Sequence, residues 1–378
     1  MLAEPGPEQR AIREAVQRYL AQEADILERL RDPARAAGDA PRRWADFARL
    51  GWLGLPLPEA HGGSGGGMAE LWPVLTALGH GLALDPYLPT VVLGGLTIAR
   101  AGSEAQQARL LPRIAAGELR LALAGMAGFP GGDADTTRAR HMTKGWRIDG
   151  HKGVVLGAPE AGLLILGTRS ASTQAEPLLL LVDPLAAGVT LRAYPLIDGR
   201  MAAEVHLHDV EVPADAVLAA GEAAVTAMEE ASLAGALACV AEAVGAMEAA
   251  LERTIAHLRQ RRQFGARLAD QQALRHRVAD MFIACQECAA LGWRAALAFD
   301  APRAGMRRMA IAAAMAHAGP ASLRVCEEAI QLHGAIAITD EIPVGHSLKR
   351  AVVAERLFGS ADHWLGVFCA AGEAVTAP

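Results

Sequence analysis

Apolar side chains recur every three or four positions along two stretches of the chain, residues 233–258 and 274–288. This spacing places the apolar side chains of each stretch on one side of an α-helix. The segment RRQFG, residues 261–265, separates the two stretches. We therefore predict two long antiparallel helices joined by a turn at residues 264–267. Further helical periods, including an Ala- and Met-rich run at 306–317, predict a bundle of four or five helices from about residue 216 onward.

The middle of the chain has a different pattern, in which short β-like pieces alternate with Gly, Pro and charged turns. The predicted strands are residues 121–124, 146–148, 153–156, 163–168, 178–182, 189–194, 204–207 and 210–212. So many short strands in so few residues favour a small antiparallel barrel or sandwich. Residues 8–119 are helical in pattern, and Ser103 is a predicted helix N-cap.

The chain is therefore predicted to be mostly α with a middle β-domain. The expected divisions are an N-terminal helical domain at 1–119, a middle β-domain at 120–215 and a C-terminal helical bundle at 216–378. Hydrophobic residues make up 52% of the chain and aromatic residues only 4%, so the core consists mainly of Ala, Leu and Val. Such a composition favours closely packed helices.

Charge and targeting signals limit the function classes. The net charge is −6 and basic residues do not form blocks, so nucleic acid is not an expected partner. The charged start MLAEPGPEQR lacks the apolar core of a signal peptide. No apolar stretch of about 18 residues is apparent, so we expect no membrane span. The cytoplasm is the expected location.

Cys285 and Cys288 form a CxxC pair among five cysteines in the whole chain. A metal or redox role is one interpretation of this pair, but no second pair completes a set of four ligands. Both cysteines fall on the apolar side of a predicted helix, so we expect buried, inert thiols and no metal site. The glycine-rich HGGSGGG at 61–67 follows no βαβ strand, and a flexible connection is its simpler interpretation.

The turn between the two long helices gathers polar groups of a particular kind. Two guanidiniums, the ring of Phe264 and the amides of Gln271 and Gln272 lie at one end of the helix pair. Arginine binds pyrophosphate oxygens in a bidentate manner and a phenylalanine ring offers a stacking face. The end therefore suits a phosphate-bearing aromatic ligand, although any polar turn between helices also carries charges.

Several motifs along the chain together resemble the acyl-CoA dehydrogenase flavoproteins. They are LGWLGLPLPEAHGG at 50–63, MAAEVHLHDVEVPADAV at 201–217, RRQFG with its following QQ and ADM, and QLHG at 331–334 followed by TDEIPVGH at 339–346. The resemblance implies an N-terminal helical domain, a small antiparallel β-barrel and a C-terminal four-helix bundle. It also implies FAD as cofactor, an acyl-CoA substrate, an electron-transferring flavoprotein as acceptor, and a homo- or hetero-tetramer.

Carried over from that family, Arg261, Phe264 and Gln272 match positions that contact the pyrophosphate and the adenine. Gln331 and Gly334 match the loop on the adenosine side. Two structural alternatives remain: Phe264 packs a helix corner, and Gly334 is an ordinary helix C-cap.

The flavin-ring side departs from the family pattern. The usual Thr and Glu of one loop are Met126 and Ala127, and the family's W-I-T-N-like strand is Val154-Val155-Leu156-Gly157. The covering tryptophan and the hydrogen-bonding threonine are thus missing. Val154 and Leu156 are expected to contact the ring through their backbone groups, and Ser360 is carried over as a further cofactor contact.

The catalytic base also departs from the pattern. In family members it is a carboxylate that removes the α proton of the acyl-CoA while the β hydride passes to the flavin. Here Phe358 occupies the common base position, and Gly235 the alternative one on the first long helix. Replacement acids are Glu355 and Glu230, each of which is otherwise a solvated carboxylate at a helix end.

Similar departures occur in the small subunits of two-chain acyl-CoA dehydrogenases of the pimeloyl-CoA type. We therefore expect an FAD-dependent acyl-CoA dehydrogenase, working alone or as the base-lacking subunit of a heteromer. Two alternatives remain open. One is a non-catalytic subunit that completes a partner's FAD site, and the other is a flavin oxidase or monooxygenase on the same fold.

Overall fold

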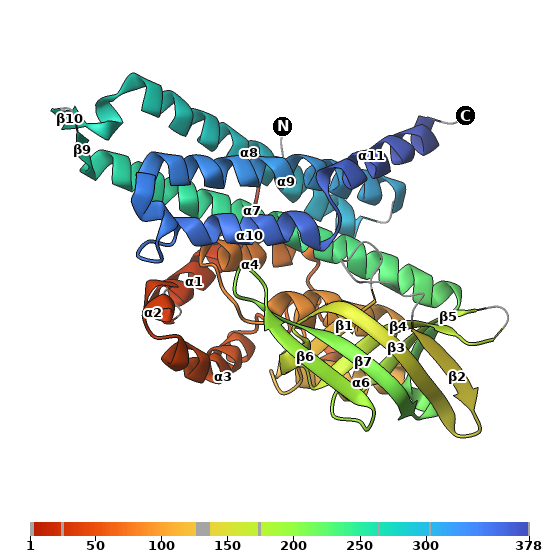
Figure 1. Cartoon of the computed structure of the whole chain (residues 1–378). Helices are drawn as coiled ribbons and strands as arrows, with labels where there is room; N and C mark the ends of the chain where they lie inside the picture. Colours follow the sequence, from red (N-terminus) through yellow and green to blue (C-terminus); the bar gives the residue numbers. More distant parts are fainter. Residues whose placement is uncertain are drawn as a thin grey trace. The chain divides into compact units, whose positions relative to one another are not determined.

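The computed structural model describes residues 4–23, 26–125, 137–172, 175–263, 265–301 and 304–376. Within these residues, helices form both ends of the chain, and all strands except a two-residue hairpin lie between residues 121 and 220 (Figure 1). The prediction of a mostly α chain with a middle β-domain is therefore confirmed. Residue contacts divide the chain into two compact units, each assembled from separate segments. The helical unit is Met1–Pro41, Met68–Ala83 and Ala236–Pro378, and the sheet unit is Arg42–Gly67 and Leu84–Gly235.

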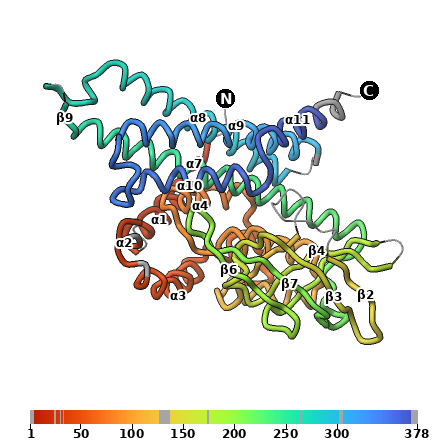
Figure 2. The backbone as a smooth tube through the Cα atoms, viewed as in Figure 1, coloured from red at the N-terminus to blue at the C-terminus, as the bar shows by residue number. Residues whose placement is uncertain are grey.

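Five long helices dominate the helical unit, as the periodicity predicts. The α7 and α8 helices lie on either side of the predicted turn, where a small hairpin of β9 and β10 replaces a simple loop (Figure 2). Helix α9 packs against α8, α10 and α11. The helices are α1 (Pro7–Glu23), α2 (Ile26–Arg31), α4 (Met68–His80), α7 (Glu222–Gln260), α8 (Gln272–Asp300), α9 (Ala304–His333), α10 (Val344–Leu357) and α11 (Ala361–Thr376), with β9 (Arg262–Gln263) and β10 (Ala266–Arg267). The first part of α7, up to Gly235, belongs to the sheet unit.

Glycine allows α4 and α7 to approach each other closely. A Cβ added to Gly245 would lie 1.9 Å from the carbonyl oxygen of Thr76, and one added to Gly79 would lie 2.1 Å from that of Glu242. Both distances are far below van der Waals contact, so a side chain at either position would force the two helices apart. The backbones of α4 and α7 therefore pack directly against each other, in keeping with the low aromatic content of the sequence.

We expect Gly245→Ala to lower the free energy of unfolding by about 1–3 kcal/mol, because the added methyl overpacks the α4–α7 crossing. Gly366→Ala in α11 is the matched control, since nothing lies within 4 Å of the position of its added Cβ. That change should be neutral or stabilising by about 0.5–1 kcal/mol. Urea denaturation of both variants gives the comparison. Equal stabilities would show that α4 and α7 do not approach as described.

Helix α7 corrects the expectation that no stretch is long and apolar enough to cross a membrane. It contains an 18-residue window of mean hydropathy 1.5, and 89% of this window is buried inside the protein. A helix that is apolar all round and covered by other helices is the ordinary core helix of a large bundle. Such burial accounts for the composition of α7.

The sheet unit contains eight hydrogen-bonded strands in the order β6-β7-β3-β2-β4-β5-β8, with β1 paired to β4. The pairs β1–β4 and β2–β4 are parallel, so the sheet is mixed and the purely antiparallel arrangement that we predicted is wrong at these two pairs. The strands are β1 (Leu121–Ala124), β2 (Arg138–Met142), β3 (Gly145–Leu156), β4 (Leu163–Ser170), β5 (Pro177–Val182), β6 (Val189–Pro195), β7 (Met201–Val212) and β8 (Val217–Ala220).

Strand boundaries differ from the prediction where the ladder is irregular. Residues 146–148 and 153–156 belong to the single strand β3, which is interrupted by register shifts after Ile148 and Lys152. Residues 204–207 and 210–212 likewise form one strand, β7, with Asp209 at a φ of 51° between them. Strand β2 was missed because Ala139 is its only fully buried residue.

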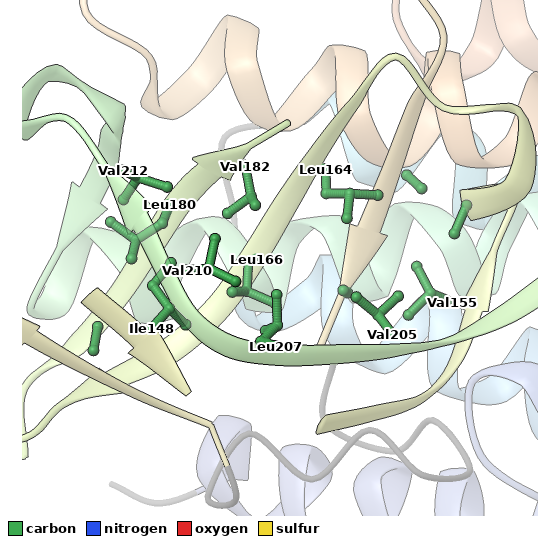
Figure 3. Close-up of a cluster of buried hydrophobic side chains, with 14 of the residues drawn as sticks. Ile148, Val155, Leu164, Leu166, Leu180, Val182, Val205, Leu207, Val210 and Val212 are labelled. Atoms are coloured by element: carbon green, nitrogen blue, oxygen red, sulfur yellow. The ribbon is translucent and has the colours of Figure 1, made fainter. Parts of the chain in front are cut away.

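Inward-facing aliphatic side chains form the core of the sheet unit (Figure 3). Val205 and Leu207 alternate along β7 with residues on the opposite face, as the two-residue period of a strand requires. The helices of this unit are α5 (Leu96–Ala101), α6 (Glu104–Ala115) and the part of α3 (Pro33–Arg49) from Arg42 onward, together with the short η1 (Glu59–His61), η2 (Leu88–Gly95), η3 (Ala158–Glu160) and η4 (Ala214–Ala216). The predicted N-cap is confirmed, because Ser103 and Gln106 form a capping box on α6.

Candidate functional site

Two of the sequence motifs meet at one end of the helical unit. The imidazole rings of His257, in the last turn of α7, and His333, the last residue of α9, lie with their centroids 4.5 Å apart at an angle of 31°. Arg261 follows one helical turn after His257, and Gln331 precedes His333 by two residues. His333 of QLHG therefore lies beside the last turn of α7, and RRQFG begins directly after the end of that helix.

The polar side chains carried over to this end are exposed, namely those of Arg261, Gln272 and Gln331. Within the described residues, no hydrogen bond or ion pair engages the Arg261 guanidinium. The nearby Arg267 differs, because its Nε and Nη2 donate to Asp270 at 3.3 Å each and thereby hold the pKa of that carboxyl below its usual range. Arg261 is thus an exposed cation that is available to a ligand, and the neighbouring Arg262 is exposed as well.

Gly265 and Gly334 lack side chains, so a ligand can come close to the backbone at this end of the helical unit. Both have positive φ, 78° and 72°, and nothing lies within 4 Å of the position of an added Cβ on either residue. Gly334 follows the last residue of α9 in a left-handed conformation, so the C-cap interpretation of this glycine is also consistent with its geometry. Phe264 lies outside the described residues.

The stacked pair His257 and His333 was not predicted as part of the site. Burial lowers the pKa of both imidazoles, and for His257 the proximity of the His333 ring and of the Arg261 guanidinium lowers it further. Both rings are therefore mainly neutral at pH 7. Nδ1 of His333 donates to the carbonyl oxygen of Ala329 at 2.8 Å, which fixes that ring in place. The only sequence signal for the pair is the His within QLHG.

In the sheet unit, the segment carried over for the flavin-ring side, residues 154–157, lies at the end of strand β3. Leu156 is 3% exposed, so its side chain packs in the interior and supplies no hydroxyl group. Gly157 follows with a φ of 74°, donates its N–H to the carbonyl oxygen of Met201 at 2.9 Å, and has no room for a Cβ beside Pro89. Val154 is partly buried on the same strand. Met126 and Ala127 lie outside the described residues.

Phe358 ends helix α10 at the position expected for the base, and its side chain is only 2% exposed. Its carbonyl oxygen accepts a hydrogen bond of 3.0 Å from the indole nitrogen of Trp364. Gly359 turns the chain with a φ of 105°, and the Ser360 hydroxyl accepts from the backbone N–H of His363 at the start of α11. The turn is therefore held by helix-capping contacts around an apolar residue. Gly235, the alternative base position, is buried in α7.

Glu355 is not the solvated carboxylate that we expected. Its side chain is 10% exposed, and its Oε2 lies 2.6 Å from Nε of Arg356. A Cβ added to Gly319 of α9 would lie 3.1 Å from Cγ of Glu355, which shows that the side chain packs against this helix. With Cys239 and other residues it also lines a cavity of about 10 Å³, roughly the space of one water molecule.

Glu230, the other replacement acid, belongs to the sheet unit, whereas Glu355 belongs to the helical unit. Its Oε2 accepts a hydrogen bond of 2.8 Å from Nη1 of Arg100, and both side chains are about one-third exposed. Both candidate carboxylates are therefore neutralised by arginine.

The CxxC pair is buried, as predicted. Cys285 and Cys288 are fully buried on α8, and burial raises the pKa of the Cys285 thiol and that of the Cys288 thiol, the latter to about 12. Such thiols stay protonated at neutral pH and are poor nucleophiles. Neither belongs to a group of metal-ligating side chains within the described parts of the chain.

Comparison with known proteins places both signature motifs within one family domain. Residues 6–118 match the family described as "Acyl-CoA dehydrogenase, N-terminal domain", and residues 225–366 match "Acyl-CoA dehydrogenase, C-terminal domain". The chain belongs to the acyl-CoA dehydrogenase family. Acyl-CoA dehydrogenase FadE12 of Mycobacterium tuberculosis is 30% identical over 364 residues, covering 92% of this chain and 91% of the relative.

Solved acyl-CoA dehydrogenases have the same fold. A variant of the Tcur3481-Tcur3483 steroid ACAD is 27% identical, with a TM-score of 0.85 over 99% of this chain and 100% of the other. The ChsE4-ChsE5 complex from Mycobacterium tuberculosis is 23% identical, with a TM-score of 0.84 over 99% of both chains. These likenesses confirm the fold that the sequence motifs imply.

Proposed function

We propose that this chain is an FAD-dependent acyl-CoA dehydrogenase subunit that needs a homologous partner chain to supply the catalytic carboxylate. The reaction is α,β-dehydrogenation of an acyl-CoA thioester, with the electrons passed on to an electron-transferring flavoprotein. Family membership supports the reaction class. The observation that carries the proposal is Phe358, a buried apolar residue at the base position, held by Trp364 and by the cap of α11.

The end of the bundle where the motifs meet fits the dinucleotide part of FAD. Arg261 offers an exposed guanidinium for the pyrophosphate, and bidentate binding of phosphate oxygens is what that group does best. Gly265 and Gly334 leave space for a ligand to reach the backbone. The neutral His257 and His333 rings add polar surface without adding charge, and the amides of Gln272 and Gln331 supply donors and acceptors.

FAD, when bound, accepts the hydride from the β carbon of the acyl group. On the ring side, we propose that the chain contacts the flavin through backbone groups, because the Leu156 side chain is buried and carries no hydrogen-bonding group. The N–H and C=O groups around Val154 and Leu156 are the ones proposed to orient the ring. Ser360 caps α11, so any cofactor contact it makes is additional to this structural role.

Removal of the α proton needs a positioned carboxylate. Phe358 accepts no proton, and Gly235 has no side chain. Glu355 and Glu230 carry arginine partners, Arg356 and Arg100, and these contacts favour structural roles for both acids. A second chain with glutamate at the position of Phe358 is therefore proposed to provide the working base.

Assembly into a tetramer, homomeric or with the partner chain, is proposed from apolar side chains on the helical unit. Phe282 and Ile283 of α8 are 53% and 52% exposed, and Leu365 of α11 is 54% exposed. Exposed patches of large apolar side chains are typical of protein interfaces. The name of the ChsE4-ChsE5 complex describes two different proteins in one assembly, and this precedent within the fold is in keeping with a heteromer.

We expect the Arg261→Ala, Gln331→Ala double variant to bind FAD on the order of 10²-fold more weakly. Loss of a charge-assisted hydrogen bond to phosphate typically costs about 1.5–3 kcal/mol, and the amide contributes further. Flavin fluorescence during titration of the apoprotein measures the change. Arg259→Ala, two residues earlier and also exposed, is the control and should bind FAD normally. Unchanged FAD affinity in the double variant would contradict the site.

A further inference from the structure

Two histidines and a glutamate meet on the sheet unit, and no role has been assigned to any of them above. In the antiparallel pair of β3 and β7, His151 lies directly opposite His206. Their ring centroids are 4.6 Å apart. Glu204 precedes His206 by two residues on the same strand and so faces the same side. One ligand atom from each of the three side chains lies within 4.8 Å of the other two.

This face of the sheet is the one away from the aliphatic core. Val205 and Leu207, which flank His206, are 0% and 4% exposed and belong to the core cluster. The three polar side chains therefore point to the other face, where they remain partly accessible. Two strands with an ordered backbone position them, and no long loop is involved.

We propose that His151, Glu204 and His206 form a binding site for a divalent transition metal ion of the zinc class. Two imidazoles and one carboxylate are a common ligand set for Zn²⁺, with further positions left for water or another ligand. Nε2 of His206 lies 3.4 Å from Oε2 of Glu204. Ligand atoms about 2.05 Å from a tetrahedral Zn²⁺ are about 3.3 Å apart, so this pair already has the required spacing.

Small side-chain rotations bring the third ligand to the ion. The spacing of up to 4.8 Å among the ligand atoms must shrink by roughly 1 Å, which rotation of a partly exposed imidazole accommodates. The ion would join β3 to β7 three residues before Val154. Both strands are already paired, so the site does not need metal in order to form.

Arg192 and Tyr194 of β6 are the neighbouring groups that modulate the site. Nη1 of Arg192 lies 3.5 Å from Oε2 of Glu204, and the arginine side chain is 72% exposed, so it is free to swing into solvent when a cation binds. The Tyr194 hydroxyl donates to the carbonyl oxygen of Gly153 at 3.0 Å and so stays in place. Removing the competing charge should therefore strengthen metal binding.

The test is calorimetric titration of the untagged full-length chain with ZnCl₂ at pH 7.5, after treatment with EDTA and dialysis. We expect about one Zn²⁺ per chain, and an affinity at least tenfold lower in His151→Ala and in His206→Ala. Arg192→Ala should bind Zn²⁺ more tightly. The matched control is His208→Ala, which removes an 88% exposed histidine two positions further along β7 and should bind as the unaltered chain does.

Circular dichroism of each variant checks that the fold is kept. Three outcomes would overturn the proposal: no stoichiometric Zn²⁺ uptake, equal affinity in His206→Ala and the unaltered chain, or loss of binding in His208→Ala alone. The last outcome would assign the ion to the separate group around Asp149 and His208.

Discussion

The purified chain without a homologous partner should dehydrogenate acyl-CoA on the order of 10²–10⁴-fold more slowly than an assembly with a chain that carries glutamate at the position of Phe358. This range is the usual contribution of a general base to an enzymatic rate. Phe358 is 2% exposed and held by Trp364, so neither water nor a nearby carboxylate replaces the missing base easily. Steady-state reduction of an artificial electron acceptor measures both rates.

Two variants decide whether the base has moved within the chain. Glu355→Gln and Glu230→Gln should leave the residual rate of the lone chain unchanged, because both carboxylates are held by arginine side chains. Each substitution keeps the size of the side chain and removes only the charge. If the lone chain dehydrogenates acyl-CoA rapidly and one of these variants abolishes that activity, the substituted glutamate accepts the proton. The requirement for a partner would then be abandoned.

Replacing Arg350 by Met should lower the free energy of unfolding by about 3–5 kcal/mol, the typical effect of breaking a buried ion pair. Arg350 is 1% exposed. Its Nη1 lies 3.3 Å from Oε2 of the buried Glu242, and its Nη2 donates to the carbonyl oxygen of Ala83 at 2.7 Å. Methionine would fill much of the volume but would leave a buried carboxylate without this cation.

Urea denaturation followed by circular dichroism measures the effect, with Lys349→Met as the control. Lys349 lies next in sequence, is 39% exposed and pairs with Asp340 at 3.7 Å, so its loss should cost less than about 1 kcal/mol. Adding Glu242→Gln to Arg350→Met should restore part of the stability, since a neutral amide then replaces the buried carboxylate. Similar stabilities for Arg350→Met and Lys349→Met would show that the buried pair is not a major contributor.

The helices were predictable because an apolar period of three to four residues is a local signal that survives in a single sequence. The strands were less predictable, because irregularities interrupt the alternation of apolar and polar residues inside single strands. These are the bulges after Ile148 and Lys152 and the positive φ of Asp209. Strand β2 has one buried residue, Ala139, and almost no apolar pattern. Pairing direction depends on strands that are distant in sequence, so the parallel pairs could not be inferred.

The candidate site residues could be predicted from the sequence motifs. The contacts between these residues could not, because they depend on tertiary packing. The burial of Glu355 depends on Gly319 of α9, which lies in a different part of the sequence. The stack of His257 on His333 depends on how α7 and α9 align, and the meeting of His151 with His206 depends on strand register. Neither helix offset nor register is written in local periodicity.

Anaerobic bleaching of the flavin by a panel of acyl-CoA thioesters tests the central claim most directly. Bleaching reports hydride transfer to the bound cofactor and does not depend on the electron acceptor. A chain that retains its flavin but is not bleached binds the cofactor without catalysing the reaction. We expect no thioester to bleach the flavin of the lone chain rapidly, and at least one to do so after co-expression with a homologue bearing the glutamate. Rapid bleaching of the lone chain would contradict this claim.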